Sequence, residues 1–337
     1  MKTAIFGYSA SGKSELFRAL SGEQAQNSNQ AIVKVPEPRL DPLIQLFNPK
    51  KVTNVEIEYL DIPGGGDPGK GVGQRVLNEI KPFECLLAVL DNFSGLVTPE
   101  KQYREMESDL MLTDLAVAEK RLERIQVDKK KGKGLVDPRE EELLEYVKSI
   151  LEQEIPLRTE EELLKNPLLK GFSFLSAKPI LYIQNVSEDK LDIEGMQGQG
   201  KSNEAHLVLS TKLERELSEL EDFEEREEFL QELGLQESAM DKIIRQTYEL
   251  LGLFTFLTAG EKEVRAWSIP RGSSAWDAAG AIHSDIQKGF IRAEVLGWND
   301  FLHYRNFKNA KQAGVLRLEG KDYLVRDGDI ITFRFNV

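Results

Sequence analysis

Residues that build disulfides and metal centres are scarce in this sequence. It contains one cysteine, Cys85, and three histidines that lie far apart, His206, His283 and His303. A single cysteine excludes an internal disulfide and a thiolate zinc cluster, and the spacing of the histidines matches no metal-binding motif.

A surplus of positive charge and long apolar runs are lacking as well. The 337 residues hold 44 Lys and Arg against 57 Asp and Glu, for a net charge of −13. This balance argues against a protein that coats DNA by charge alone. No segment approaches the ~18 apolar residues of a membrane span, and the start of the chain lacks the apolar run of a signal peptide. We therefore expect a cytoplasmic protein with neither DNA nor a membrane as its partner.

What is present is apolar material for real cores, since 40% of the residues are hydrophobic. Short apolar or alternating segments separated by helical patterns predict strands of a parallel sheet, and therefore an α/β fold. The expected strands are residues 2–6, 55–61, 85–91, 179–185 and 207–210.

The strand–helix alternation is interrupted near residue 97. Thr98-Pro99-Glu100 is typical of a helix start, and apolar residues then recur at helical spacing to about residue 127. A lysine-rich turn (128–134) leads to a second expected helix at about 137–153. Two long helices joined by a turn form a helical hairpin. Such a hairpin either packs only on itself or serves as an arm that binds a partner, and the sequence leaves both interpretations open.

A second change in composition falls near residue 253, where a strongly acidic stretch (214–241) gives way to a nearly neutral segment. A helix at about 274–284 among strand-like runs predicts a small β-grasp-like module. Those runs are 262–269, 314–320, 321–325 and 329–337. The expected domains are residues 1–96 with 171–252 for the sheet domain, 97–170 for the inserted hairpin and 253–337 for the β-grasp-like module.

The strongest motif is the segment Gly7–Ser14, GYSASGKS, which matches the P-loop pattern G-x-x-x-x-G-K-[ST] between an expected strand and an expected helix. Backbone N–H groups of such a loop and the helix N-terminus cradle phosphates. We expect Lys13 to contact the β- and γ-phosphates and to act catalytically, and Ser14 to bind Mg²⁺. The remaining expected contacts of this loop are Ser9, Ala10, Ser11, Gly12 and Glu15.

The segment Asp61-Ile62-Pro63-Gly64 follows the next expected strand. In P-loop NTPases an Asp at this point holds Mg²⁺ and the Gly N–H senses the γ-phosphate. Residues 64–73, GGGDPGKGVG, are unusually rich in glycine. They suit a switch segment that nucleotide orders, although a plain mobile loop is the alternative.

Asn185-Val186-Ser187-Glu188 comes directly after another expected strand, where GTPases place N-K-x-D to bind guanine. Glu188 stands in the place of the Asp, whose short carboxylate accepts two hydrogen bonds from guanine, so guanine selectivity should be weakened. Ser210, Thr211 and Lys212 follow the last expected strand of the sheet and fit a further loop that contacts the base.

Together, these motifs resemble those of the Obg-like ATPase (YchF) family, and the resemblance covers nearly the whole chain. The segments that carry the resemblance include VPEPRLDPL (35–43), YLDIPG (59–64), KGVGQ (70–74), AKPILYIQNVSE (177–188) and AGVLRLEGKDYLVRDGDIITFRFNV (313–337). The resemblance implies a P-loop NTPase that prefers ATP to GTP and uses Mg²⁺, with a C-terminal TGS domain and a helical hairpin. It also implies association with the ribosome, RNA or stress machinery through the TGS-like domain and the hairpin.

Several positions depart from that family's pattern. Ala10-Ser11 replace its usual Asn-Val, and Glu15 replaces its Thr. Residues 15–52 contain no Thr for the switch segment, with Ser21 and Ser28 as weak substitutes, and Gly65 offers no side chain to orient water. These departures leave two main functions open: a nucleotide switch with slow Mg²⁺-dependent hydrolysis, and a nucleotide-binding scaffold with little or none. A kinase acting on a metabolite is a third, less favoured reading.

Overall fold

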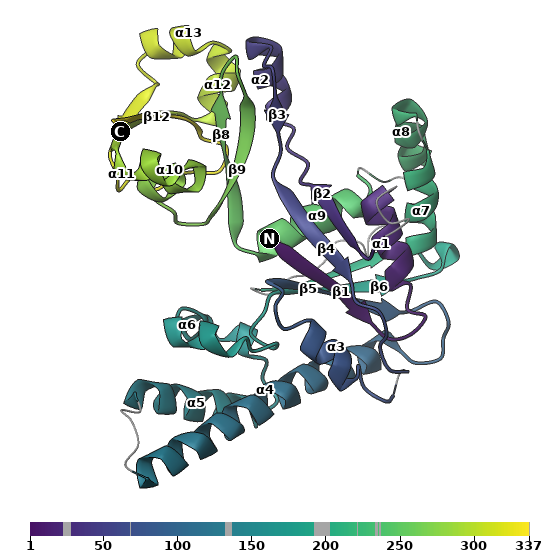
Figure 1. The fold of residues 1–337 in the computed structure, drawn as a ribbon. Helices are drawn as coiled ribbons and strands as arrows, with labels where there is room; N and C mark the ends of the chain where they lie inside the picture. The colour runs from purple at the N-terminus through teal and green to yellow at the C-terminus, as the bar shows by residue number, and fades with distance from the viewer. Residues whose placement is uncertain are drawn as a thin grey trace. The chain divides into compact units, whose positions relative to one another are not determined.

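The computed structural model describes residues 1–22, 28–67, 69–131, 137–191, 203–220, 222–232, 235 and 237–336. They form two compact units, the first made of residues 1–33 and 58–250 and the second of residues 34–57 and 251–337 (Figure 1). The sequence also predicts a loop at 194–204, most of which lies outside the described residues, as does part of the lysine-rich turn at 128–134.

The first unit is built on a sheet with the strand order β2-β4-β1-β5-β6-β7. The pairs β1·β4, β1·β5, β5·β6 and β6·β7 are all parallel, which confirms the predicted α/β class. Connections between parallel neighbours must cross over the sheet, and helices supply these crossovers. The strands are β1 (Lys2–Gly7), β2 (Gln30–Lys34), β4 (Glu56–Asp61), β5 (Cys85–Asp91), β6 (Ile180–Asn185) and β7 (Glu204–Leu209).

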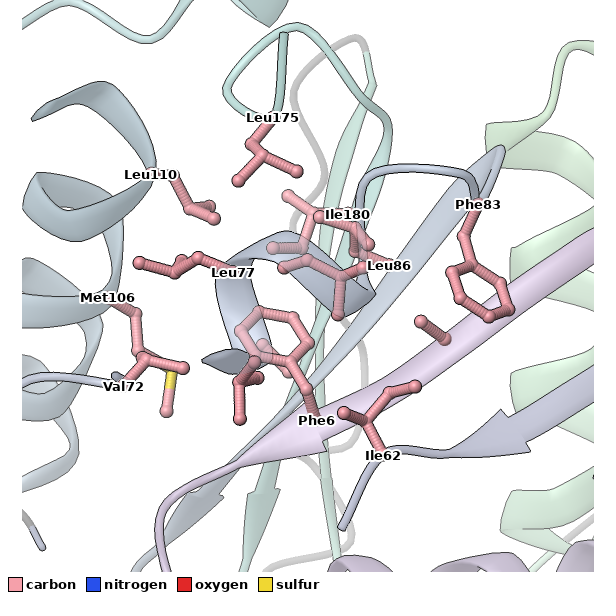
Figure 2. Close-up of a cluster of buried hydrophobic side chains, with 14 of the residues drawn as sticks. Phe6, Ile62, Val72, Leu77, Phe83, Leu86, Met106, Leu110, Leu175 and Ile180 are labelled. Atoms are coloured by element: carbon pink, nitrogen blue, oxygen red, sulfur yellow. The ribbon is translucent and has the colours of Figure 1, made fainter. Parts of the chain in front are cut away.

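Strand β5 lies in the centre of this sheet, and every one of its residues is buried. Its continuous apolar sequence fits a strand that is covered on both faces. Alternate residues of β1 and β5, such as Phe6 and Leu86, join one core with Met106 and Leu110 of the long helix α4 (Pro99–Lys130). Figure 2 shows these side chains converging on one face of the sheet.

The inserted hairpin consists of α4 and α5 (Pro138–Leu151), and both helices begin as their sequences predict. Thr98 and Asp137 cap the two helices, each followed by a proline at the first helical position, where the missing N–H costs nothing. The helices pack on each other through apolar residues such as Leu122 and Leu144. Three short turns then lead back to the sheet: η2 (Leu157–Thr159), α6 (Glu161–Leu164) and η3 (Pro167–Phe172).

A buried ionic cluster joins these turns to the sheet. Arg158 of η2 is fully buried, and its Nη1 lies 2.7 Å from Glu107 of α4 and 3.3 Å from Glu204 of β7. Its Nε donates to the Lys178 carbonyl at 3.0 Å, and Tyr182 donates its hydroxyl hydrogen to Glu107. Burial alone lowers the pKa of Arg158, but these carboxylates raise it overall, so the guanidinium stays charged.

Further helices complete the first unit. Helix α1 (Lys13–Ser21) follows the P-loop, and α3 (Gln74–Glu79) follows the glycine-rich loop. The acidic stretch (214–241) lies in α7 (Thr211–Glu219), α8 (Phe223–Glu232) and the start of α9 (Ala239–Leu250).

The second unit contains a sheet with the order β11-β10-β12-β8-β9-β3. Strands β8 and β9 pair antiparallel, β10 and β12 pair antiparallel, and the two hairpins meet through the parallel pair β8·β12. With α10 following β9, this is the strand and helix arrangement of a β-grasp. The strands are β3 (Val52–Thr53), β8 (Leu253–Ala259), β9 (Val264–Pro270), β10 (Phe290–Leu296), β11 (Arg317–Glu319) and β12 (Ile330–Phe335). The helices are α2 (Leu40–Phe47), α10 (Ala275–Ile282), α11 (Ser284–Lys288), α12 (Trp298–Tyr304) and α13 (Phe307–Gln312).

Some local predictions for the second unit were wrong. Residues 321–325 form no strand, only a single bridge from Leu324 to Ser274, while β8 and β10 were not predicted at all. Residues 34–57 belong to this unit because β3 pairs with β9 and Arg39 forms ion pairs with Glu37 and Asp327. Contacts between segments more than 200 residues apart in the chain, such as β3 with β9, cannot be predicted from a local sequence pattern.

Candidate functional site

The P-loop segment lies where its motif predicts, between β1 and α1 at the carboxyl edge of the first sheet. Gly12 has a φ of +94°, and a Cβ built there would lie 2.1 Å from Nδ2 of Asn185. A side chain at this position would meet both backbone strain and a clash. The second glycine of the motif is therefore required by the approach of Asn185 from β6.

Lys13 is almost completely buried at the start of α1. Its Nζ donates to the Tyr8 carbonyl at 3.3 Å, and no carboxylate of the described residues lies within ion-pair distance of it. Burial lowers the pKa of Lys13 from its ordinary value, and the nearby Asp61 carboxylate offsets only part of this effect. A buried cation with a single carbonyl partner is suited to an anionic ligand.

Ser14 and Asp61 bring two oxygen ligands together at the end of β4. The Ser14 hydroxyl donates to Oδ2 of Asp61 at 2.8 Å, while Oδ1 of Asp61 is buried and has no hydrogen-bond partner within the described part of the chain. Hydroxyl and carboxylate oxygens are ligands that Mg²⁺ accepts, together with water and phosphate oxygens. The unpartnered Oδ1 therefore fits the presence of a cation beside the P-loop.

The glycine-rich loop starts directly after Asp61 and contacts the P-loop. Gly64 is exposed, and the Ser9 hydroxyl donates to the Gly65 carbonyl at 3.0 Å. The Ser9 N–H donates to the Gly66 carbonyl at 3.2 Å, so this amide does not point at a ligand here. A Cβ on Gly65 would lie 2.1 Å from the Gly7 carbonyl oxygen, so a glutamine or apolar residue here would require a different path of the loop.

Asn185 joins the phosphate end of the site to the base end. Its Nδ2 donates to the Ser11 carbonyl at 3.0 Å, and its Oδ1 accepts the Thr211 N–H at 3.0 Å. Val186 is buried, and its N–H donates to the Leu209 carbonyl of β7 at 2.8 Å. In this conformation the Asn185 amide therefore connects three loops of the protein.

Glu188 lies at the mouth of the site and forms an ion pair with Lys212 of α7 at 2.9 Å. Ser210 is buried and caps α7 by accepting the Leu213 N–H at 3.4 Å. On the same side, Glu15 pairs with Arg18 at 2.7 Å and with Arg215 of α7 at 3.2 Å. The Glu15 carboxylate is thus held by arginines at the surface.

These residues surround a cavity of about 900 Å³, which is within the range of small-molecule sites. Its lining brings together the P-loop, the segment after β6 and the first turns of α7. Among the predicted residues, the lining includes Ala10, Gly12, Lys13, Ser14, Glu15, Asn185, Val186, Glu188, Ser210 and Thr211. Ser9, Ser11, Asp61 and Gly64 are not part of that lining; Ser11 is fully buried behind the loop.

The lining also includes residues that the sequence did not predict for the site: Phe93, Asp189, Arg215, Glu216 and Glu219. Lys212, which belongs to the segment predicted to contact the base, is part of the lining as well. Lys212 and Arg215 are three apart on α7, so a helix starting at Ser210 places them on the same face. The two serines weighed as switch residues have local partners: Ser21 donates to the Phe17 carbonyl at 2.5 Å, and Ser28 accepts the Gln30 N–H at 3.0 Å.

The fold and site together define the class of protein as a P-loop NTPase with a GTPase-type domain. The family model described as "50S ribosome-binding GTPase" matches residues 2–131. A second model, YchF-GTPase_C, described as "Protein of unknown function (DUF933)", matches residues 253–336. Within the described residues, no helix is both long and apolar enough to cross a membrane.

Comparison with known proteins then gives the family. The ribosome-binding ATPase YchF of Bacillus subtilis is 40% identical, with 100% of both chains covered. The protein of the same name from Escherichia coli O157:H7 is 38% identical, with 100% of this chain and 99% of the relative covered. The solved Schizosaccharomyces pombe YchF GTPase superposes with a TM-score of 0.84 at 27% identity, covering 99% of this chain and 97% of that one. The chain belongs to the YchF family.

Proposed function

We propose that this protein binds ATP in preference to GTP, hydrolyses it slowly with Mg²⁺, and acts as a nucleotide switch on the ribosome. The observation that carries the proposal is the buried Lys13, whose only hydrogen-bond partner among the described residues is a carbonyl, beside a cavity of about 900 Å³. Phosphate oxygens would replace that carbonyl as partners of the ammonium group, and charge-assisted bonds of this kind are the stronger ones.

Mg²⁺ fits beside this lysine. Ser14 and Asp61 would hold it, because their oxygens already meet and Oδ1 of Asp61 is left without a partner in the described chain. When bound, the ion would supply positive charge that offsets the negative charge of the phosphates. Lys13 would donate hydrogen bonds to the phosphates, and the N-terminus of α1 would contribute the positive end of its helix dipole.

The base end of the site supports the preference for ATP. Glu188 replaces the shorter aspartate of GTPases, and its carboxylate is engaged by Lys212 at 2.9 Å. A guanine would have to break this ion pair to gain its acceptor, whereas adenine makes no such demand. The preference is therefore expected to arise from a weakened guanine site.

A second candidate is a nucleotide-binding scaffold with little or no hydrolysis. It is favoured by Gly65, which has no side chain to orient water and whose close approach to Gly7 leaves no room for one. Residues 15–52 also supply no Thr. A single-turnover assay separates the two candidates, because only the switch predicts ADP formation above the rate of a Lys13→Ala control.

A ribosome contact is supported by the relatives, which are named ribosome-binding ATPases. We assign the partner contact to the helical hairpin and the second unit, which matches the expectation of a TGS-like module. In that unit the Arg265 guanidinium stacks on Trp267, with 3.7 Å from Cζ to the ring centroid. Such a planar cation can contact RNA bases and phosphates. Co-sedimentation with ribosomes, with and without a non-hydrolysable ATP analogue, tests the nucleotide dependence of this contact.

Calorimetric titration of ATP and of GTP, each with Mg²⁺, tests the central proposal. The wild-type chain should bind ATP more tightly than GTP, and Lys13→Ala should bind both about 100-fold more weakly than wild type. Lys13→Arg is unsuitable as a control because it keeps the positive charge at position 13. Lys170→Ala is the matched control, because Lys170 is exposed and lies in η3, far from the P-loop in the sequence. Equal binding by wild type and Lys13→Ala would show that the phosphate site is elsewhere.

A further inference from the structure

Two carboxylates of α4 contact the glycine-rich loop, which we define here by its described residues, 64–67 and 69–73. Glu105 and Asp109 are four residues apart and therefore lie on the same face of the helix. Oε2 of Glu105 accepts the Gly69 N–H at 2.9 Å, and Oδ2 of Asp109 accepts the Val72 N–H at 2.6 Å. Both bonds run from loop backbone to an anionic acceptor, which strengthens them.

Glu105 also contacts the P-loop. The same Oε2 accepts the hydroxyl hydrogen of Tyr8 at 3.1 Å, and the Tyr8 carbonyl accepts Nζ of Lys13. Burial and the negative charge of Glu105 raise the pKa of Tyr8, so its hydroxyl remains a donor. One carboxylate oxygen therefore connects the residue that contacts Lys13 with the loop that follows Asp61.

Apolar packing fixes the same loop to the same helix. Val72 is buried in the core that contains Met106 and Leu110 of α4, and Figure 2 shows these side chains lying together. The loop is thus held at Gly69 and Val72 by carboxylates and at Val72 by a hydrophobic contact as well. These contacts are enough to give it a defined position.

Helix α4 continues from this point into the hairpin. Its residues Leu122 and Ile125 belong to the core shared with α5. The helix that holds the loop is therefore the same continuous element that carries the proposed partner arm. Movement of the loop changes the surroundings of Glu105 and Asp109, and these lie on a helix that extends into the arm.

We propose that Glu105 and Asp109 are positioning residues, which hold the glycine-rich loop against the P-loop and link its nucleotide-dependent state to the hairpin. This inference rests on the proposed function. Neither carboxylate lines the nucleotide cavity. Their role is to place the loop backbone next to the phosphates, while nucleotide affinity depends on the P-loop itself.

The test is the double variant Glu105→Ala/Asp109→Ala in the full chain, with Glu105→Gln/Asp109→Asn as the conservative pair. Loss of both acceptors should slow single-turnover ATP hydrolysis about tenfold, with ATP affinity changed by less than about twofold. The amide variants keep an acceptor oxygen without the charge, so they should recover a large part of the rate. Glu123→Ala, an exposed carboxylate further along α4, is the matched control and should behave as wild type.

Hydrogen exchange at the Gly69 and Val72 amides gives a second readout that needs no turnover. The alanine variant should exchange these amides about tenfold faster than wild type, and ATP analogue should no longer change exchange in the α4–α5 hairpin. If the wild type binds ATP without hydrolysing it, this readout decides the inference.

The possible outcomes distinguish a failure of the positioning role from a failure of the proposed nucleotide binding. Unchanged turnover and unchanged exchange in a folded alanine variant would overturn the positioning role and leave the nucleotide proposal standing. Affinity that falls in parallel with turnover would also overturn it, because the carboxylates would then be supporting the pocket itself. A wild type that binds no nucleotide would overturn the proposed function and, with it, the link to the hairpin.

Discussion

Two buried cations of the first unit, Lys13 and Arg158, have opposite surroundings. Arg158 meets two carboxylates and a carbonyl, and its pKa is raised. Lys13 meets one carbonyl, and its pKa is lowered by burial. Arg158 thus has two carboxylates at ion-pair distance, whereas Lys13 has none among the described residues and only the nearby charge of Asp61.

This difference separates a structural charge from a charge kept for a ligand. A buried ion pair costs desolvation of both partners, and removing one partner leaves the other uncompensated. A buried cation without an anion carries that cost in the folded protein until an external anion arrives. Substitutions at the two positions should therefore act on different quantities, stability at Arg158 and binding at Lys13.

The largest effect is expected for Arg158→Met. It leaves Glu107 and Glu204 buried without their cation, so the free energy of unfolding should fall by about 3–5 kcal/mol. Urea denaturation measures this, with the exposed Arg124→Met on α4 as control. ATP affinity of the folded variant should stay within about twofold of wild type, because Arg158 does not line the nucleotide cavity. A loss below ~1 kcal/mol would contradict a structural role of the cluster.

Lys13→Met should reverse this pattern. Loss of charge-assisted bonds to phosphate should weaken ATP binding about 100-fold, or ~2.7 kcal/mol, in calorimetry. The free energy of unfolding without nucleotide should stay the same or rise, since a poorly compensated charge has been removed. A marked loss of stability would show that Lys13 is structural after all.

The next effect concerns Mg²⁺. Chelation of the metal should weaken ATP binding by the wild type about tenfold, whereas Ser14→Ala and Asp61→Asn should respond by less than about twofold. Both variants remove an oxygen ligand or its charge from the pair that meets at 2.8 Å. The measurement is ATP titration with and without chelator. A full Mg²⁺ response in both variants would place the metal elsewhere.

Glu188→Asp should move the preference toward GTP by about tenfold, by shortening the carboxylate to the length that binds guanine in GTPases. The ratio of ATP to GTP dissociation constants measures the shift. Lys212→Met, which frees Glu188 from its ion pair at 2.9 Å, should move the ratio in the same direction by a smaller factor. No change in either variant would mean that position 188 does not contact the base.

The smallest effect is a pH dependence. The pKa of Lys13 is lower in the folded chain than its ordinary value of 10.5, so the unfolded chain binds the proton more tightly. Stability should therefore rise as the pH increases toward 10.5 in the wild type relative to Lys13→Met. Denaturation of both proteins between pH 7 and 10 checks the sign, and saturating ATP should abolish this rise with pH in the wild type. A wild-type stability that falls or stays constant relative to Lys13→Met as the pH rises would contradict the lowered pKa.

Local sequence patterns were sufficient to predict the structure wherever residues close together in the chain determine it. The apolar run 85–91 became β5 with the same bounds, and the glycine pattern around Lys13 became a strand–loop–helix turn. The first hairpin helix begins after Thr98, as predicted, and the second, expected at about 137–153, spans Pro138–Leu151.

Contacts between distant segments were not predictable in the same way. The two bonds of Asn185 depend on where Ser11 and Thr211 lie in space, and Glu105 was one acid among many on a long helix. Residues 321–325 alternate like a strand but pair only at Leu324. Each of these outcomes depends on tertiary packing, which no local pattern contains.

The bridging amide of Asn185 has a thermodynamic consequence for any ligand of this cavity. Because one side chain bonds both the Ser11 carbonyl and the Thr211 N–H, the loops on either side have given up much of their independent motion during folding. A ligand that spans them then loses less conformational entropy of the protein on binding. Because the loops are already ordered in the folded protein, a small number of polar contacts would be enough to bind a nucleotide tightly.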